Sequence, residues 1–190
     1  MTTNNLALPK AFSSEFRSVE LILNSNCKTR AVDALIIVCA KYEKQLRRIF
    51  VHLAHQYFEM NLGDLQKVIS SKRLYPINFI KGIECLLKIE MGELIGLDHK
   101  DLCDGIAKLT KVRNKLVHGQ LTGMKLSRKE LNQHTQRAIR WMSALGDSSK
   151  AKFGFDGIAR KYPRRASKTD IGEGKLKTAQ EFDELLKLMS

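Results

Sequence analysis

Residues 33–58, DALIIVCAKYEKQLRRIFVHLAHQYF, decide the fold class of this chain. The opening eight residues are almost all apolar, which is typical of a helix that is buried on several sides. After Lys41 the apolar residues recur every three or four positions with basic residues between them, the pattern of an amphipathic helix. The spacing predicts one long helix over residues 29–58.

Shorter helical patterns lie on both sides of this segment. We expect further helices over residues 13–26, 63–72, 76–94, 98–118 and 127–145, and a last one after residue 178. Ser127 with Glu130 and Thr178 with Glu181 form capping boxes that mark two helix starts. No alternating strand pattern of useful length occurs. The sequence therefore predicts an all-α fold, an antiparallel bundle of four main helices plus short extra helices.

The composition is that of one globular domain with a tail. Of the 190 residues, 43% are hydrophobic and 28% are charged, which excludes collagen, coiled coil and wholesale disorder. We assign residues 1–147 to the bundle and residues 148–190 to a basic linker and a C-terminal docking helix. No stretch reaches the roughly 18 apolar residues of a membrane span, and the N-terminus lacks a secretory signal pattern. We expect a cytoplasmic protein without a membrane partner.

The charge of the chain is a first indication of function. Lys and Arg number 33 against 20 Asp and Glu, a formal net charge of +13. Such a charge attracts polyanions through its long-range field and through counterion release, so a nucleic acid is the partner that we expect. The alternative is a basic protein without a specific nucleic-acid partner.

The predicted helix over residues 98–118 carries a charge on its apolar face. Leu102, Ile106, Leu109 and Leu116 follow steps of four and three, and the position that completes the pattern is occupied by Arg113. A buried guanidinium is costly unless it is paired or faces a wet cleft. Asn114 and His118 follow, four residues apart and hence neighbours on one helix face, and Gly119 ends the helix.

The motif Arg113-Asn114-x-x-x-His118 resembles the R-x4–6-H signature of the HEPN superfamily of helical ribonucleases, and the resemblance covers about residues 13–146. It implies metal-independent RNA cleavage in which the ribose 2′-hydroxyl attacks the adjacent phosphate. His118 would be the general acid and base, Arg113 would stabilise the phosphorane-like charge, and Asn114 would orient the phosphate or the histidine. The resemblance also implies a homodimer with a composite active site, and Glu43 as a supporting residue.

Two functions of different classes follow from these observations. The first is an RNA-cleaving bundle, as in a toxin or phage-defence effector with an antitoxin or regulatory partner. The second is a non-catalytic HEPN-like module that binds RNA or protein. Neither needs a cofactor. His52, His55 and Glu59 have a spacing that can bind metal, but a third clear ligand is missing and a packed or solvated histidine pair is the alternative.

Basic residues on three segments are the candidates for phosphate contacts. They are Lys41, Lys44, Arg47, Arg48, Lys111, Lys115, Arg160, Lys161, Arg164 and Arg165. In the tail, Phe153, Phe155 and Tyr162 are interleaved with basic residues, which favours stacking on unpaired bases. The alternative is a solvated linker that ties down the last helix, whose apolar face covers either its own bundle or a partner. That face consists of Phe182, Leu185, Leu186 and Met189.

Overall fold

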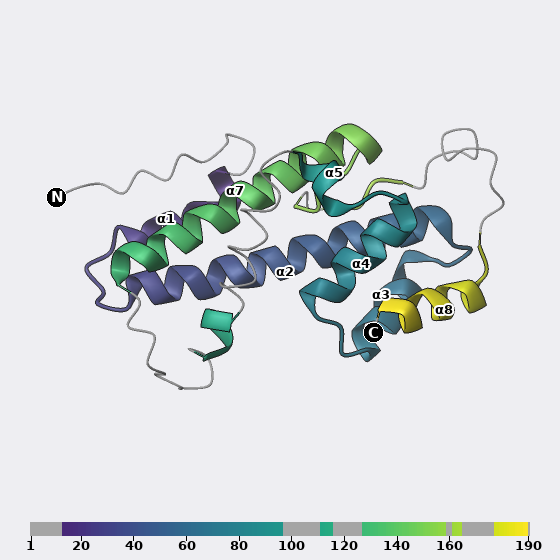
Figure 1. The fold of residues 1–190 in the computed structure, drawn as a ribbon, viewed down its shortest axis with the longest axis horizontal. Helices are drawn as coiled ribbons and strands as arrows, with labels where there is room; N and C mark the ends of the chain where they lie inside the picture. Colours follow the sequence, from purple (N-terminus) through teal and green to yellow (C-terminus); the bar gives the residue numbers. More distant parts are fainter. Residues whose placement is uncertain (1–12, 97–110, 116–126, 159–160, 165–176, 190) are drawn as a thin grey trace. The chain divides into compact units, whose positions relative to one another are not determined.

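The computed structural model describes residues 13–96, 111–115, 127–158, 161–164 and 177–189, and these residues are predominantly helical (Figure 1). The labelled helices are α1 (Ser13–Leu23), α2 (Arg30–Tyr57), α3 (Leu62–Ser71), α4 (Pro76–Leu87), α5 (Met91–Ile95), α7 (Arg128–Phe153) and α8 (Ala179–Met189). Residues 111–115 are also helical. The described residues form no strand, only an isolated bridge between Phe58 and Lys177. The predicted all-α class is confirmed.

The chain divides into two compact units. Unit 1 consists of Met1–Tyr42 and Ile95–Leu145, and unit 2 consists of Glu43–Leu94 and Gly146–Ser190. Helices α2 and α7 each begin in unit 1 and end in unit 2.

Aromatic and aliphatic side chains from three helices form the core of unit 1. Phe16 and Val19 of α1 are fully buried, as are Leu35 and Val38 of α2. On α7, Trp141 is fully buried and its ring meets that of Tyr42 edge-on, with the ring centroids 4.9 Å apart. Trp141 therefore serves packing, because a ring without exposed surface has no face to offer a base.

The C-terminal helix α8 completes the core of unit 2. Phe182 packs against Phe50 and Phe58 of the α2 segment, with ring centroids 6.3 and 5.0 Å away. At the other end of α8, the Asn78 side chain of α4 donates a hydrogen bond to the Met189 carbonyl. The four apolar residues of α8 are all buried. The predicted docking helix therefore covers its own chain.

Helix α7 is longer than the sequence predicts. The prediction ended it at Leu145 because Gly146-Asp147-Ser148-Ser149 reads as a stop signal, but the helix continues to Phe153. Ser149 is fully buried on the helix face that continues the core, and small residues there allow close packing. The helix ends where the amide of Gly154, at φ 75°, donates to the Lys150 carbonyl. The predicted end is therefore wrong.

Two other helix boundaries also differ from the prediction. The expected helix over residues 76–94 is broken at Lys88, which takes a left-handed conformation with φ 56° after α4. The helix expected over residues 63–72 begins one residue earlier, at Leu62, because Asn61 is its N-cap: the Asn61 side-chain oxygen accepts a hydrogen bond of 2.9 Å from the Asp64 amide. Both predicted capping boxes, by contrast, are confirmed at Ser127 and Thr178.

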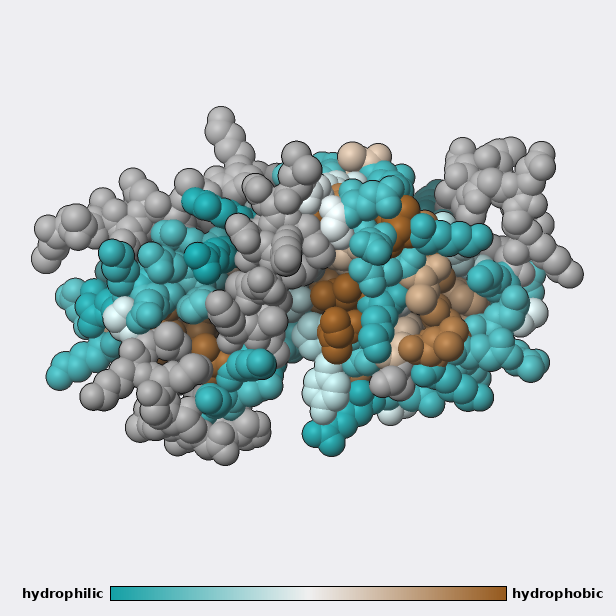
Figure 2. All heavy atoms as spheres, in the orientation of Figure 1, coloured by the Kyte–Doolittle hydropathy of each residue, from teal (hydrophilic) through white to brown (hydrophobic). Residues whose placement is uncertain are grey.

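The surface that Figure 2 shows is mostly hydrophilic where it is coloured, with a few apolar patches. The large apolar side chains that the structure exposes are Leu21, Tyr75, Ile77 and Leu188. Within the part of the chain that the structure describes, no helix has both the length and the apolar character that crossing a membrane requires.

Candidate functional site

The Arg113 segment, residues 111–115, is the described part of the predicted catalytic motif. It is helical, with Val112 buried and Arg113 half-buried. Nη1 of Arg113 donates a hydrogen bond of 2.8 Å to Oδ1 of Asn114, which is exposed. Because an amide is neutral, this bond orients the guanidinium without cancelling its charge. An oriented, partly exposed guanidinium is suited to binding a phosphate.

The other predicted members of the site lie outside the described residues or in the other unit. His118, Arg160 and Arg165 lie outside them. Glu43 is half-buried on α2 and belongs to unit 2, whereas the Arg113 segment belongs to unit 1. Its supporting role stays a prediction.

Several predicted RNA contacts on α2 have structural partners. Nζ of Lys41 lies 2.9 Å from Oε1 of Glu15 and 5.9 Å from the centroid of the Phe16 ring, which ties α2 to α1. Arg47 donates a hydrogen bond to the Ser70 hydroxyl of α3. Lys44 is exposed. An engaged lysine is a weaker phosphate ligand than an exposed one, because the bound carboxylate already offsets its charge.

Arg48 holds the segment that follows α7. Its guanidinium carbon lies 5.4 Å from the centroid of the Phe155 ring and 4.9 Å from that of Tyr162. Nη1 of Arg48 donates a hydrogen bond of 3.0 Å to the Ile158 carbonyl. We call these four residues the Arg48 clamp. Cation–π contacts and a charge-assisted hydrogen bond together give this arginine a structural role.

Phe155 is unavailable for the predicted base stacking. Its side chain is 2% exposed, and its ring lies against Tyr162, with centroids 5.3 Å apart. The prediction for Phe155 is wrong because the sequence pattern does not reveal the partners, Arg48 and His52, that cover the ring. Phe153 and Tyr162 are half-buried.

The remaining predicted basic residues are accessible. Lys111 is exposed and Lys115 half-buried on the Arg113 segment, and Lys161 and Arg164 are exposed beyond α7. Their contacts with RNA stay predictions.

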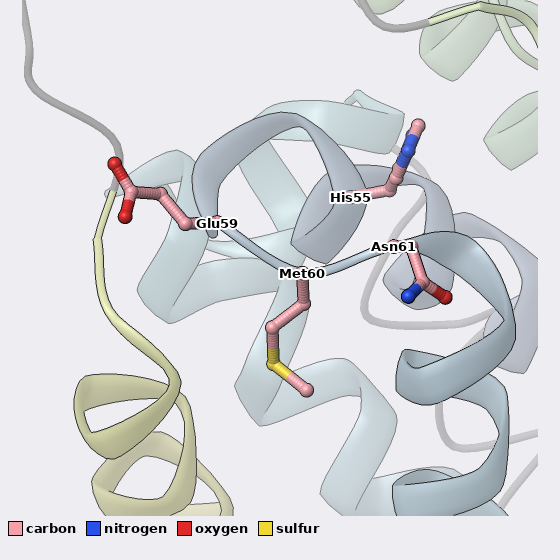
Figure 3. A pocket seen from close by; sticks show the side chains of 4 residues that line it. All are labelled: His55, Glu59, Met60 and Asn61. Atoms are coloured by element: carbon pink, nitrogen blue, oxygen red, sulfur yellow. The ribbon is translucent and has the colours of Figure 1, made fainter.

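The histidines of α2 do not converge with Glu59 on a metal site. Figure 3 shows a pocket lined by His55, Glu59, Met60 and Asn61, in which the imidazole and the Glu59 carboxylate point away from each other. His52 instead lies against the rings of Phe153 and Phe155, with centroids 5.9 and 4.9 Å away. Among the described residues, no three His, Cys, Asp or Glu side chains form a group that suits a metal ion.

A second pocket lies at His52, in unit 2. Its volume is about 460 Å³, and it is lined by His52, Leu53, Gln56, Tyr57, Leu87, Lys152, Phe153, Gly154, Pro163 and Arg164. We call it the His52 pocket. His52 is 2% exposed, and burial lowers the pKa of its imidazole below the ordinary value. This pocket could not be predicted from local sequence patterns, because its walls come from segments about a hundred residues apart.

Comparisons with known proteins do not assign the chain to a family. No protein-family model, no curated protein and no solved structure matches this chain.

Proposed function

We propose that this protein is a metal-independent endoribonuclease that cleaves RNA by transesterification. The observation that carries the proposal is the Arg113 segment, where the side chain of Asn114 holds a partly exposed guanidinium. The net charge of +13 supports an RNA substrate, since a polyanion is drawn to such a protein.

The proposed reaction gives one task to His118 and another to Arg113. His118 takes the proton from the ribose 2′-hydroxyl, and the resulting oxygen attacks the adjacent phosphorus. The bond to the 5′-oxygen breaks, and that oxygen takes up a proton from the imidazolium. The products are a 2′,3′-cyclic phosphate and a 5′-hydroxyl. Arg113 binds the phosphate oxygens, on which negative charge grows in the transition state.

The proposed enzyme is a homodimer with a composite site, because one copy of the motif supplies a single arginine and a single histidine. Further contacts with the RNA backbone come from the accessible basic residues, with Arg160 and Arg165 beyond the described part of the chain. The accessible ones are Lys44, Lys111, Lys115, Lys161 and Arg164. Light scattering at micromolar concentration is expected to give twice the mass of one chain, and a clean monomer would contradict the composite site.

The decisive experiment is incubation of the purified protein with transfer RNA in the presence of EDTA. We expect fragments with cyclic phosphate ends, and none from DNA, which lacks the attacking hydroxyl. His118→Ala is expected to stop cleavage. His134→Ala, which removes a histidine of α7 outside the motif, serves as the matched control and is expected to cleave normally.

Two outcomes would overturn the proposal. Equal cleavage by the wild type and His118→Ala would assign the activity to another site or to a contaminant. Intact RNA, with salt-sensitive binding that His118→Ala does not change, would favour the non-catalytic RNA-binding module.

A further inference from the structure

The described residues that line the His52 pocket include two cationic side chains. Lys152 of α7 and Arg164 both line it, and both side chains are exposed. Among the described residues that line the pocket, none is Asp or Glu. Two cations with no carboxylate among these described residues favour an anionic ligand.

A buried polar atom in the lining lacks a partner. Nε2 of His52 lies 3.4 Å from the Phe153 carbonyl, which makes Nε2 the protonated nitrogen of the neutral ring. Nδ1 is then a hydrogen-bond acceptor, and it is buried without a hydrogen-bond partner in the structure. A buried acceptor without a partner is costly, so this position calls for an explanation beyond packing.

The rest of the lining suits a flat ring. Tyr57 and Phe153 provide half-buried aromatic side chains, and Gln56 provides a side-chain amide. Aromatic side chains stack on nucleobases, and an amide pairs with their polar edges. The volume of about 460 Å³ falls within the roughly 300–1,000 Å³ that is usual for small-molecule sites.

We propose that the His52 pocket binds a phosphorylated nucleoside, with the phosphate at Lys152 and Arg164 and the base beside the aromatic side chains. The ligand is either a free mononucleotide or the 5′-phosphorylated end of an RNA strand. The site lies wholly within unit 2 and does not depend on the proposed cleavage at the Arg113 segment.

The test is calorimetric titration of the full-length protein with AMP. We expect saturable binding, weakened about tenfold or more in the double variant K152M/R164M, because each cation contributes a charge-assisted contact. The matched control is K150M/K187M, which removes two charges at exposed positions that do not line the pocket. It is expected to bind AMP within about twofold of the wild type. Melting curves check that both variants are folded.

Binding of oligonucleotides with and without a 5′-phosphate distinguishes the two sources of the ligand. Strands made of 2′-O-methyl nucleotides lack the attacking hydroxyl, so cleavage cannot affect the result. Tighter binding of the phosphorylated strand than of the unphosphorylated strand, with this difference lost in K152M/R164M, identifies an RNA end. Tighter binding of AMP identifies a free mononucleotide.

Four outcomes would overturn the proposal. They are no saturable binding of AMP or of the phosphorylated strand, equal loss in both double variants, adenosine binding as tightly as AMP, and inorganic phosphate competing as well as AMP. The first two outcomes would rule out the binding site. The third would rule out a contribution of the phosphate to binding, and the last would rule out a contribution of the nucleoside. None of them bears on whether His118→Ala cleaves RNA.

Discussion

Arg48 and Arg113 each stand among apolar residues on a helix, but their guanidinium groups have different surroundings. Arg48 lies against two aromatic rings and donates to a carbonyl 110 residues away in the sequence. Arg113 donates to the side chain of the next residue, a neutral amide at an exposed position. The first arrangement joins two distant segments of the fold, whereas the second joins neighbouring residues of one helical segment. A charge on an apolar helix face therefore has two explanations, which only the partners distinguish.

The largest expected change in the free energy of unfolding comes from a substitution in the segment that the Arg48 clamp holds. Gly157 has φ 76°, and a Cβ there would meet the Gln45 carbonyl oxygen at 2.9 Å and Cγ1 of Ile49 at 2.8 Å. Gly157→Ala is expected to lower the free energy of unfolding by about 2–4 kcal/mol, from backbone strain and overpacking. Urea unfolding measures this loss.

Gly154 is the matched control for this substitution. Its φ is 75°, but a Cβ there has no neighbour within 4 Å. Gly154→Ala is expected to cost only the left-handed backbone strain, about 1 kcal/mol. Equal losses at the two glycines would mean that the clamped segment does not pack on α2 as described.

Local signals made part of this fold predictable from sequence. The capping boxes at Ser127 and Thr178 lie where they were expected, because both partners of each box are three residues apart. The end of α7 and the break at Lys88 were not predicted, since tertiary packing overrides local propensity there.

At the candidate site too, local sequence patterns do not reveal contacts between distant segments. The spacing of apolar residues singled out Arg113, but nothing local indicates that Arg48 has partners more than a hundred residues away. Phe155 looked suited to base stacking for the same reason. Contacts between distant segments set its burial, and the His52 pocket consists of such contacts.

An intermediate effect sharpens the difference between the two arginines. Arg48→Met is expected to lower the free energy of unfolding by about 2 kcal/mol, because two cation–π contacts and a charge-assisted hydrogen bond are lost. Arg113→Met is expected to cost less than Arg48→Met, since the bond from Arg113 to Asn114 joins neighbouring residues and not distant segments of the chain. Chemical denaturation of both variants side by side gives the comparison, which breaks down if Arg113→Met is the more destabilising.

The smallest expected effect is a pH dependence at His52, which is uncharged at neutral pH. Burial lowers the pKa of His52 in the folded chain, so the unfolded chain takes up this proton at a higher pH than the folded chain does. The contribution of His52 to stability is therefore complete above the unfolded pKa, about 6.5, and is lost as the pH falls from there toward the lower folded pKa.

His52→Phe isolates this contribution, because it leaves the other four histidines in place. The difference in unfolding free energy between the wild type and His52→Phe is expected to shift against the wild type between pH 7.5 and pH 5.5. A difference that does not change with pH would mean that His52 is not buried against Phe153 and Phe155.

The central claim is that Arg113 takes part in RNA cleavage whereas Arg48 stabilises the fold. The most direct test is the rate at which Arg113→Lys and Arg48→Lys cleave transfer RNA in EDTA. Both substitutions keep the charge and remove the planar guanidinium fork. With rates corrected for the folded fraction, Arg113→Lys is expected to lose about a hundredfold or more, and Arg48→Lys is expected to stay within about twofold of the wild type. Equal losses in the two variants, or full activity of Arg113→Lys, would contradict this assignment.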